Sequence, residues 1–380
     1  MRHTAGVHQV ELSYSFGVSR ASAAIRNPLM DLLQAIRAHG SISAAAKGMG
    51  LSYRHVWGEL KKWEQTLGHT LVVWEKGHPA RLSEFGDKLL WAERQAQARL
   101  APQIDALQAE LERTFAVAFD DAAHVVSFTA SHDDALNRLR DHAVATNKLH
   151  LDIRFTGSVD AIGALNEGRC EMAGFHTTLA PATGSLSERT YKPLLQPGQH
   201  KLIGFARRTQ GLMVARGNPG NLRTLQDLTR PGVRFVNRPK GTGTRLLLDE
   251  LLADEGIAAG DIVGYEQTEP SHSAVAHAVA SGAADAALGI ELAAHAHGLD
   301  FVPLRQENYF LVCLKSTLDL PATQALLAVL RSEAWQQQLA RMPGYEPSHT
   351  GEVLAMNRVL SWWDFPNKKA PRPQALSGEG

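Results

Sequence analysis

The sequence predicts a multidomain fold, in which a helix-rich unit is followed by a two-part α/β unit. Three observations support this prediction. First, 380 residues exceed the length of one ordinary domain. Second, residues 26–111 show almost only helical spacing and are rich in Ala, Leu, Gln and Arg. Third, residues 123–343 alternate short Val/Ile/Phe runs with helical segments, which is typical of βαβ units with mainly parallel sheets.

Composition and charge exclude several classes of protein. Apolar residues make up 44% and charged residues 21%, which is incompatible with wholesale disorder. Lys plus Arg and Asp plus Glu both number 39, so the whole chain is not a polycation that coats nucleic acid. No apolar run is long enough for a membrane span, and the N-terminus lacks the apolar core of a secretory signal. The two cysteines cannot form a disulfide framework. We therefore expect a cytoplasmic protein without a membrane partner.

The first helices have the spacing of a helix-turn-helix. Pro28 suits the first turn of a helix that ends near Gly40. Ser41 or Ser43 then caps a short Ala-rich helix, and Ser52 caps a third helix that ends near residue 67. Two short helices joined by a tight turn form the helix-turn-helix, whose second helix enters the major groove of DNA.

The segment after these helices predicts a wing and a basic surface. Residues 71–83 read as two short strands around a Gly/Pro turn, which gives a winged helix-turn-helix domain over residues 26–84. Eight basic and four acidic residues lie between positions 26 and 81 of a chain with no net charge. These charges could simply solvate a helix face, but the helix spacing and the wing favour binding to double-stranded DNA. The candidate DNA-contacting residues are Ser43, Ser52, Tyr53, Arg54, His55, Lys61, Lys62, Lys76, His78 and Arg81.

Residues 85–114 predict a linker helix that mediates dimerisation. An apolar stripe recurs at steps of three, four or seven residues, at Leu89, Ala96, Leu100, Ile104, Leu107 and Leu111. Pro102 lies inside this stripe and predicts a kink or two separate helices. The stripe favours pairing with a second copy, as a dimer or a dimer of dimers; the alternative is packing against the chain's own second unit.

The second unit is expected over residues 123–350, with a second lobe at about residues 212–292. Its candidate strands are 124–130, 151–157, 171–176, 233–237, 261–266 and 285–290, and its candidate helices are 132–146, 159–168, 243–255 and 271–281. We expect residues 1–25 to form an N-terminal segment with a strand, and the tail 365–380 to be disordered.

Polar residues follow several of these strands, where the loops of an α/β sheet meet helix N-termini. Ligands bind at that edge, and free backbone N–H groups at helix starts favour anions. The sharpest motif is Gly241-Thr242-Gly243-Thr244-Arg245, which combines close backbone approach, hydroxyl donors and a guanidinium. The alternative for each Ser or Thr is that it only caps its helix. The candidate ligand-binding residues are Ser131, His132, Gly157, Ser158, Arg238, Gly241, Thr242, Gly243, Thr244, Arg245, Ser271 and His272.

Catalytic and metal-binding motifs are absent from the sequence. Ser131-His132-Asp133 contains the residue types of a hydrolase triad, but consecutive residues cannot adopt its geometry. His272 and His277 lie five residues apart, and His295 and His297 two apart, so neither pair has the i, i+4 spacing of a helical zinc site. We therefore expect no enzyme activity, no cofactor and no metal.

Two segments resemble known families. The run SISAAAK followed by MGLSYRHVW resembles the N-terminal domain of LysR-type regulators and, more closely, of molybdate-dependent regulators of the ModE type. The wing departs from that pattern, because residues 76–81 replace a glycine-dense turn. The runs NRPKGTGTR and VASGAADAALGI resemble a molybdate-binding-like domain with the type II periplasmic-binding-protein fold. This resemblance implies two α/β lobes joined by crossing strands, at QGLMVAR and residues 301–314, with the ligand between them.

Together these features predict a one-component, DNA-binding transcriptional regulator that senses a small anion. A fully ionised oxyanion only accepts hydrogen bonds, so hydroxyls and helix-terminal amides suit it. The loops do not choose among molybdate, tungstate, sulfate and phosphate; the resemblance favours molybdate or tungstate. Arg238, Lys240 and Arg245 suit an organic anion equally well. A further alternative is a ligand-binding module whose helix-turn-helix contacts protein and not DNA.

Overall fold

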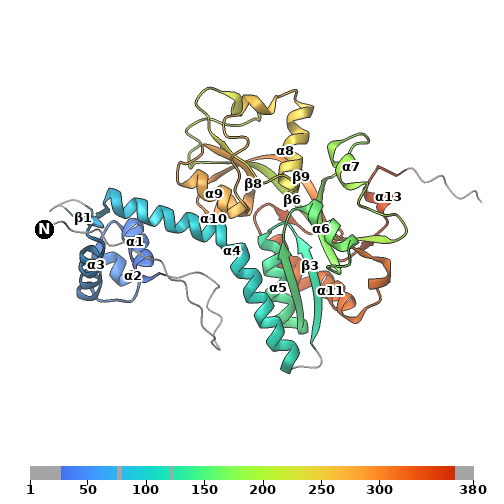
Figure 1. Cartoon of the computed structure of the whole chain (residues 1–380), viewed down its shortest axis with the longest axis horizontal. Helices are drawn as coiled ribbons and strands as arrows, with labels where there is room; N and C mark the ends of the chain where they lie inside the picture. The colour runs from blue at the N-terminus through green and yellow to red at the C-terminus, as the bar shows by residue number, and fades with distance from the viewer. Residues whose placement is uncertain (1–26, 75–78, 120–122, 364–380) are drawn as a thin grey trace, which may run out of the picture.

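The computed structural model describes residues 27–74, 79–119 and 123–363 (Figure 1). The expected N-terminal strand and disordered tail lie outside the described residues, as do Lys76 and His78.

The N-terminal unit is the predicted winged helix-turn-helix. Its helices are α1 (Pro28–His39), α2 (Ile42–Gly48) and α3 (Tyr53–Leu67). The side chains of Asn27, Ser41 and Ser52 cap them, so Ser41 and not Ser43 starts the second helix. Strands β1 (Val72–Val73) and β2 (Arg81–Leu82) pair antiparallel as the wing. Their apolar side chains form one core with the three helices, so the unit has a hydrophobic core of its own.

A single 36-residue helix, α4 (Glu84–Phe119), follows the wing. We expected a kink or two separate helices at Pro102; the second alternative is wrong, since Pro102 lies inside a continuous helix. Figure 1 shows that α4 changes direction along its length, as a helix with an internal proline does. One half packs against α9 (His272–Ala280) and the other against β4 (Leu149–Phe155). Leu107 of the apolar stripe remains 53% exposed.

The C-terminal unit is built on one curled mixed sheet. Its main strands are β3 (His124–Ala130), β4, β5 (Met172–Thr178), β6 (His200–Val214), β7 (Phe235–Val236), β8 (Ala286–Ile290) and β9 (Asp300–Leu314). They lie in the order β4-β3-β5-β9-β6-β8-β7, and β10 (Tyr345–Glu346) and β11 (Val353–Leu354) also pair with β6. The outer pairs are parallel, but β6 and β9 run antiparallel to their neighbours, so the sheet is not mainly parallel. These two 15-residue strands cross between the two lobes. β9 matches the expected segment 301–314, whereas β6 begins ten residues before the expected segment QGLMVAR and ends at Val214.

Helices cover the sheet in two lobes (Figure 1). Lobe I carries α5 (Asp134–Asn147), α6 (Ser158–Asn166), α7 (Leu186–Tyr191), α11 (Pro321–Arg331), α12 (Glu333–Ala340) and α13 (Met356–Val359). Lobe II carries α8 (Gly243–Asp254), α9 and α10 (Glu291–Ala296). The strand expected at residues 261–266 is wrong, because a 3₁₀ helix at Ala259–Asp261 and turns occupy this segment. Gly264 has φ +90°, and a Cβ there would lie 2.1 Å from the Phe235 carbonyl oxygen, so the chain bends sharply against β7.

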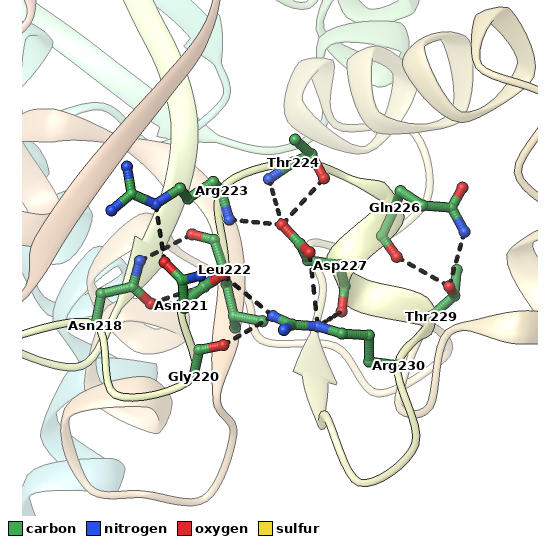
Figure 2. A network of polar contacts seen from close by, with 10 residues as sticks. All are labelled: Asn218, Gly220, Asn221, Leu222, Arg223, Thr224, Gln226, Asp227, Thr229 and Arg230. Atoms are coloured by element: carbon green, nitrogen blue, oxygen red, sulfur yellow. Dashed lines mark hydrogen bonds and ion pairs between the residues drawn. The ribbon is translucent and has the colours of Figure 1, made fainter.

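A loop of lobe II between β6 and β7 is ordered by its own polar contacts (Figure 2). The Asp227 carboxylate accepts hydrogen bonds from the backbone N–H groups of Arg223 and Thr224, each at 2.8 Å. Arg230 donates to the Gly220 carbonyl at 2.8 Å. This network holds the 3₁₀ helix Gln226–Thr229 so that Leu222, Leu225 and Leu228 enter the core of lobe II.

Candidate ligand site and DNA-binding face

The two lobes meet where the N-termini of α6 and α8 face each other. The Val159 N–H of lobe I donates to the Gly241 carbonyl of lobe II at 3.4 Å. A Cβ at Gly157 would lie 2.7 Å from that carbonyl oxygen, so only glycine permits this approach. The two lobes therefore touch each other at this point.

The structure buries most of the predicted ligand residues at this junction. They are Ser131, His132, Ser158, Arg238, Thr242, Thr244, Ser271 and His272. The hydroxyl oxygens of Ser131 and Ser158 lie 3.3 Å apart, which joins the ends of β3 and α6. Thr242 caps α8 and donates to the Pro239 carbonyl at 2.8 Å, and Ser271 caps α9, so these two hydroxyls serve the helices.

Arg245 is buried but turns away from the junction. Its Nε donates to Asp249 at 3.0 Å and one terminal nitrogen to Glu266 at 3.4 Å. The guanidinium also lies over the Tyr265 ring, 4.1 Å from its centroid. The other terminal nitrogen has no partner among the described residues. The arrangement does not bring Arg245 together with Ser131 and Ser158.

Crossing strand β6 supplies polar residues that the loop pattern did not indicate. Arg208 forms ion pairs with both Asp133 and Glu307, all three being buried. The Gln210 Nε2 donates to Glu307 and to the Thr244 hydroxyl, each at 3.0 Å. The run Arg207-Arg208-Thr209-Gln210 interrupts an otherwise apolar strand, and this signal was present in the sequence.

Arg238 is the buried cation without a carboxylate partner in the described part of the chain. Only 2% of its surface is exposed, and its terminal nitrogen donates to the Glu269 main-chain carbonyl at 3.2 Å. Its Nε has no hydrogen-bond partner among the described residues. Burial, and secondarily the charge of Arg208, lower the pKa of Arg238 to about 9. Because an unpaired buried charge is costly, this position favours an enclosed anion.

Three buried histidines surround the same junction. Burial, then the charge of Arg238, lower the pKa of His132 to about 3. Burial, and secondarily Arg208, lower the pKa of His176 far below its ordinary value, and burial with nearby cations does the same for His272. All three are therefore neutral near pH 7. The described residues contain no group of three or more side chains placed to hold a metal ion.

The third helix of the N-terminal unit presents the predicted DNA face to solvent. Ser52, Tyr53, Arg54 and His55 are exposed at the start of α3, and Ser43 and Arg81 are exposed nearby. Trp57 was not among the predicted DNA-contacting residues. It is 37% exposed on the same helix and stacks on Tyr53, with ring centroids 6.3 Å apart. Lys61 and Lys62 are exposed but pair with Glu64 at 2.7 Å and Glu59 at 4.0 Å.

The linker helix touches the loop that holds Arg238. Arg99 of α4 donates through Nε and a terminal nitrogen to both carboxylate oxygens of Glu269, at 2.8 and 2.6 Å. The Ser271 hydroxyl donates to the Ala98 carbonyl at 3.3 Å. Glu269 therefore contacts α4 with its side chain and Arg238 with its main chain.

Family models match two parts of the chain. The model described as "PBP superfamily domain" matches residues 140–331, and the one described as "Bacterial regulatory helix-turn-helix protein, lysR family" matches residues 29–87. An uncharacterized Bacillus subtilis protein, YvgK, is 35% identical over 221 residues, or 58% of this chain and 70% of its own.

The similarity to solved structures is weaker. A mutant of OxyR from Corynebacterium glutamicum has a TM-score of 0.41 at 16% identity, covering 82% of this chain and 93% of its own. A putative phosphate transporter substrate-binding protein from Clostridium perfringens, solved with bound phosphate, has a TM-score of 0.45 at 14% identity, covering 59% and 100%. None of the described helices is long and apolar enough to cross a bilayer.

Proposed function

Because the chain belongs to the PBP superfamily and carries a LysR-family regulatory helix-turn-helix, we propose that it is a one-component transcriptional regulator that senses an enclosed anion. In this proposal its LysR-family helix-turn-helix binds DNA, its PBP-superfamily domain binds a ligand, and the protein has no enzyme activity. In the proposal, two copies joined through α4 place their α3 helices on double-stranded DNA in the cytoplasm.

The buried guanidinium of Arg238 is the observation that supports an anionic effector. Arg208 has two carboxylate partners, whereas Arg238 has a carbonyl and an unpartnered Nε. An anion bound beside Arg238 neutralises its charge and completes its hydrogen bonds. The hydroxyls of Ser131 and Ser158, at the N-terminus of α6, supply further hydrogen-bonding groups at the same junction.

Two classes of effector are considered for this position. The first is molybdate or tungstate, which the sequence resemblance implies; Arg238 and the hydroxyls of Ser131 and Ser158 would donate hydrogen bonds to it. An organic anion is the alternative, and the acceptor atoms of Gln210 and the histidines favour it. Both need the lobes to separate for entry, since Gly157 lies against Gly241 in the closed state.

The contact between Glu269 and α4 supports a route from ligand to DNA. An anion that shifts the Arg238 guanidinium also shifts the Glu269 carbonyl to which it is hydrogen-bonded. The Glu269 carboxylate is in turn hydrogen-bonded to Arg99 of α4. Opening or closing the lobes then shifts α4 and the spacing of the two α3 helices. Such a ligand changes DNA affinity only by binding the two states with different affinity.

A mobility-shift assay with the DNA upstream of the protein's own gene tests the proposal. We expect binding that weakens as salt is raised, and a change in affinity when the effector is added. The anions to titrate are molybdate, tungstate, sulfate and simple carboxylates. If the protein binds anions but shifts no DNA at low salt, the proposal is wrong, and the alternative of a ligand-binding module whose helix-turn-helix contacts protein remains.

A further inference from the structure

We infer that the effector is an organic anion that also donates hydrogen bonds, with one anionic group at Arg238 and at least one N–H or O–H group facing His176 and Gln210. This inference rests on the proposed function and deepens it. It follows from buried hydrogen-bond acceptors at the junction that have no donor among the described residues.

His176 carries two unsatisfied ring nitrogens. It is 3% exposed, and neither Nδ1 nor Nε2 has a hydrogen-bond partner among the described residues. A neutral imidazole has one donor and one acceptor nitrogen, whichever tautomer forms. Its ring packs on Tyr309 with centroids 3.9 Å apart, and the Tyr309 hydroxyl also has no partner among the described residues. This aromatic pair therefore offers a ligand both a donor and an acceptor.

Gln210 presents a second buried acceptor. Because its Nε2 donates to the Glu307 carboxylate, the orientation of the amide is fixed, and Oε1 is left without a donor among the described residues. Gln210 is fully buried and reaches Thr244 at the start of α8. A Cβ at Gly243, the residue before Thr244, would lie 3.0 Å from His176 Nδ1, so Gln210 and His176 approach the same end of α8.

A fully ionised tetrahedral oxyanion does not match this set of groups. It only accepts hydrogen bonds, so it leaves Gln210 Oε1 and one nitrogen of His176 unpaired. Its two charges also exceed the single uncompensated cation, since Arg208 is already paired with Asp133 and Glu307. A ligand with one anionic group and a donor satisfies Arg238, His176 and Gln210 together.

The test is a thermal-shift screen of the full-length protein followed by calorimetric titration. The probes are molybdate, tungstate, sulfate and phosphate, a library of organic metabolites that are anionic at neutral pH, and the best hit with its donor methylated. We expect the largest shift from an organic anion with an N–H or O–H group. Its methylated analogue should bind roughly 5- to 150-fold more weakly, the factor for one unpaired buried group.

The variant His176→Phe separates this inference from the proposed function. It keeps a ring against Tyr309 and removes only unpartnered nitrogens, so the folded protein should be at least as stable. The hit should lose roughly 5- to 150-fold in affinity, and its methylated analogue should lose little. His69→Phe, at an exposed ring stacked on Phe85, is the matched control and should change neither affinity.

Three other outcomes contradict the account. A larger shift from molybdate or another oxyanion than from every organic anion overturns the inference and leaves the proposed function standing. So does an organic anion whose methylated analogue binds equally well. If no anion of any kind shifts the protein, the proposed function fails and the inference fails with it.

Discussion

Arg238→Met should stabilise the ligand-free protein and abolish its response to anions. Burial lowers the pKa of Arg238 to about 9, so the group is still charged at pH 7 and its cost is present there, fading only above pH 9. At about 1.4 kcal/mol for each pKa unit, this depression corresponds to a cost on the order of 5 kcal/mol. Loss of the hydrogen bond to the Glu269 carbonyl offsets about 1–3 kcal/mol. The remaining gain of roughly 2–4 kcal/mol predicts a Tm higher by about 4–16 °C in a domain of this size.

Differential scanning calorimetry without ligand, and then with a binding anion, measures both effects. Arg234→Met is the control, because Arg234 lies four residues away, is half exposed and pairs with Asp285 at 2.8 Å. An exposed pair contributes about 1 kcal/mol or less, so this variant should have a slightly lower Tm and a normal anion response. A lower Tm for Arg238→Met together with an intact anion response would refute the reasoning.

Three further changes test the remaining assignments. Arg54→Ala should weaken DNA binding by about 1–3 kcal/mol without altering the circular dichroism spectrum, because its side chain is exposed on α3; unchanged affinity would exclude it from the interface. Thr244→Val removes an acceptor from Gln210 and a hydroxyl from the junction, so calorimetry should show anion affinity reduced by roughly 1–3 kcal/mol; an undiminished affinity would place the ligand elsewhere. Arg99→Glu should reduce the effect of anion on DNA affinity, and Arg99→Glu with Glu269→Arg should restore it; if the single variant keeps the full effect, the route does not pass through this pair.

Local signals in the sequence were sufficient to predict the elements that position the site. Ser52 was placed correctly as the start of a helix because capping chemistry is set by neighbouring residues; at Thr242 the capping alternative describes what the structure shows. The crossing strands were expected only because the resemblance to the periplasmic-binding-protein fold implied them. The strand predicted at residues 261–266 was wrong. Val263 and Tyr265 suit a strand, but the close approach of Gly264 to Phe235 requires a turn.

The partners of the buried polar side chains could not be predicted. Arg238 and Arg245 both follow the same predicted strand in the sequence. Arg245 forms an ion pair with Asp249, one helical turn later, whereas Arg238 donates only to the main-chain carbonyl of Glu269. Arg208 and Glu307 are 99 residues apart and become neighbours only because β6 and β9 pair. His176 was passed over because an imidazole in an apolar strand gives no local sign of lacking partners.

The most direct test of the central claim is the equilibrium affinity of the full-length protein for labelled DNA from upstream of its own gene, measured by fluorescence anisotropy. Each titration is run with and without the anion that gives the largest thermal shift. We expect that anion to change the affinity of the wild-type protein and to leave that of Arg238→Met unchanged. Equal wild-type affinity with and without the anion, or an equal anion effect in both proteins, would contradict the account.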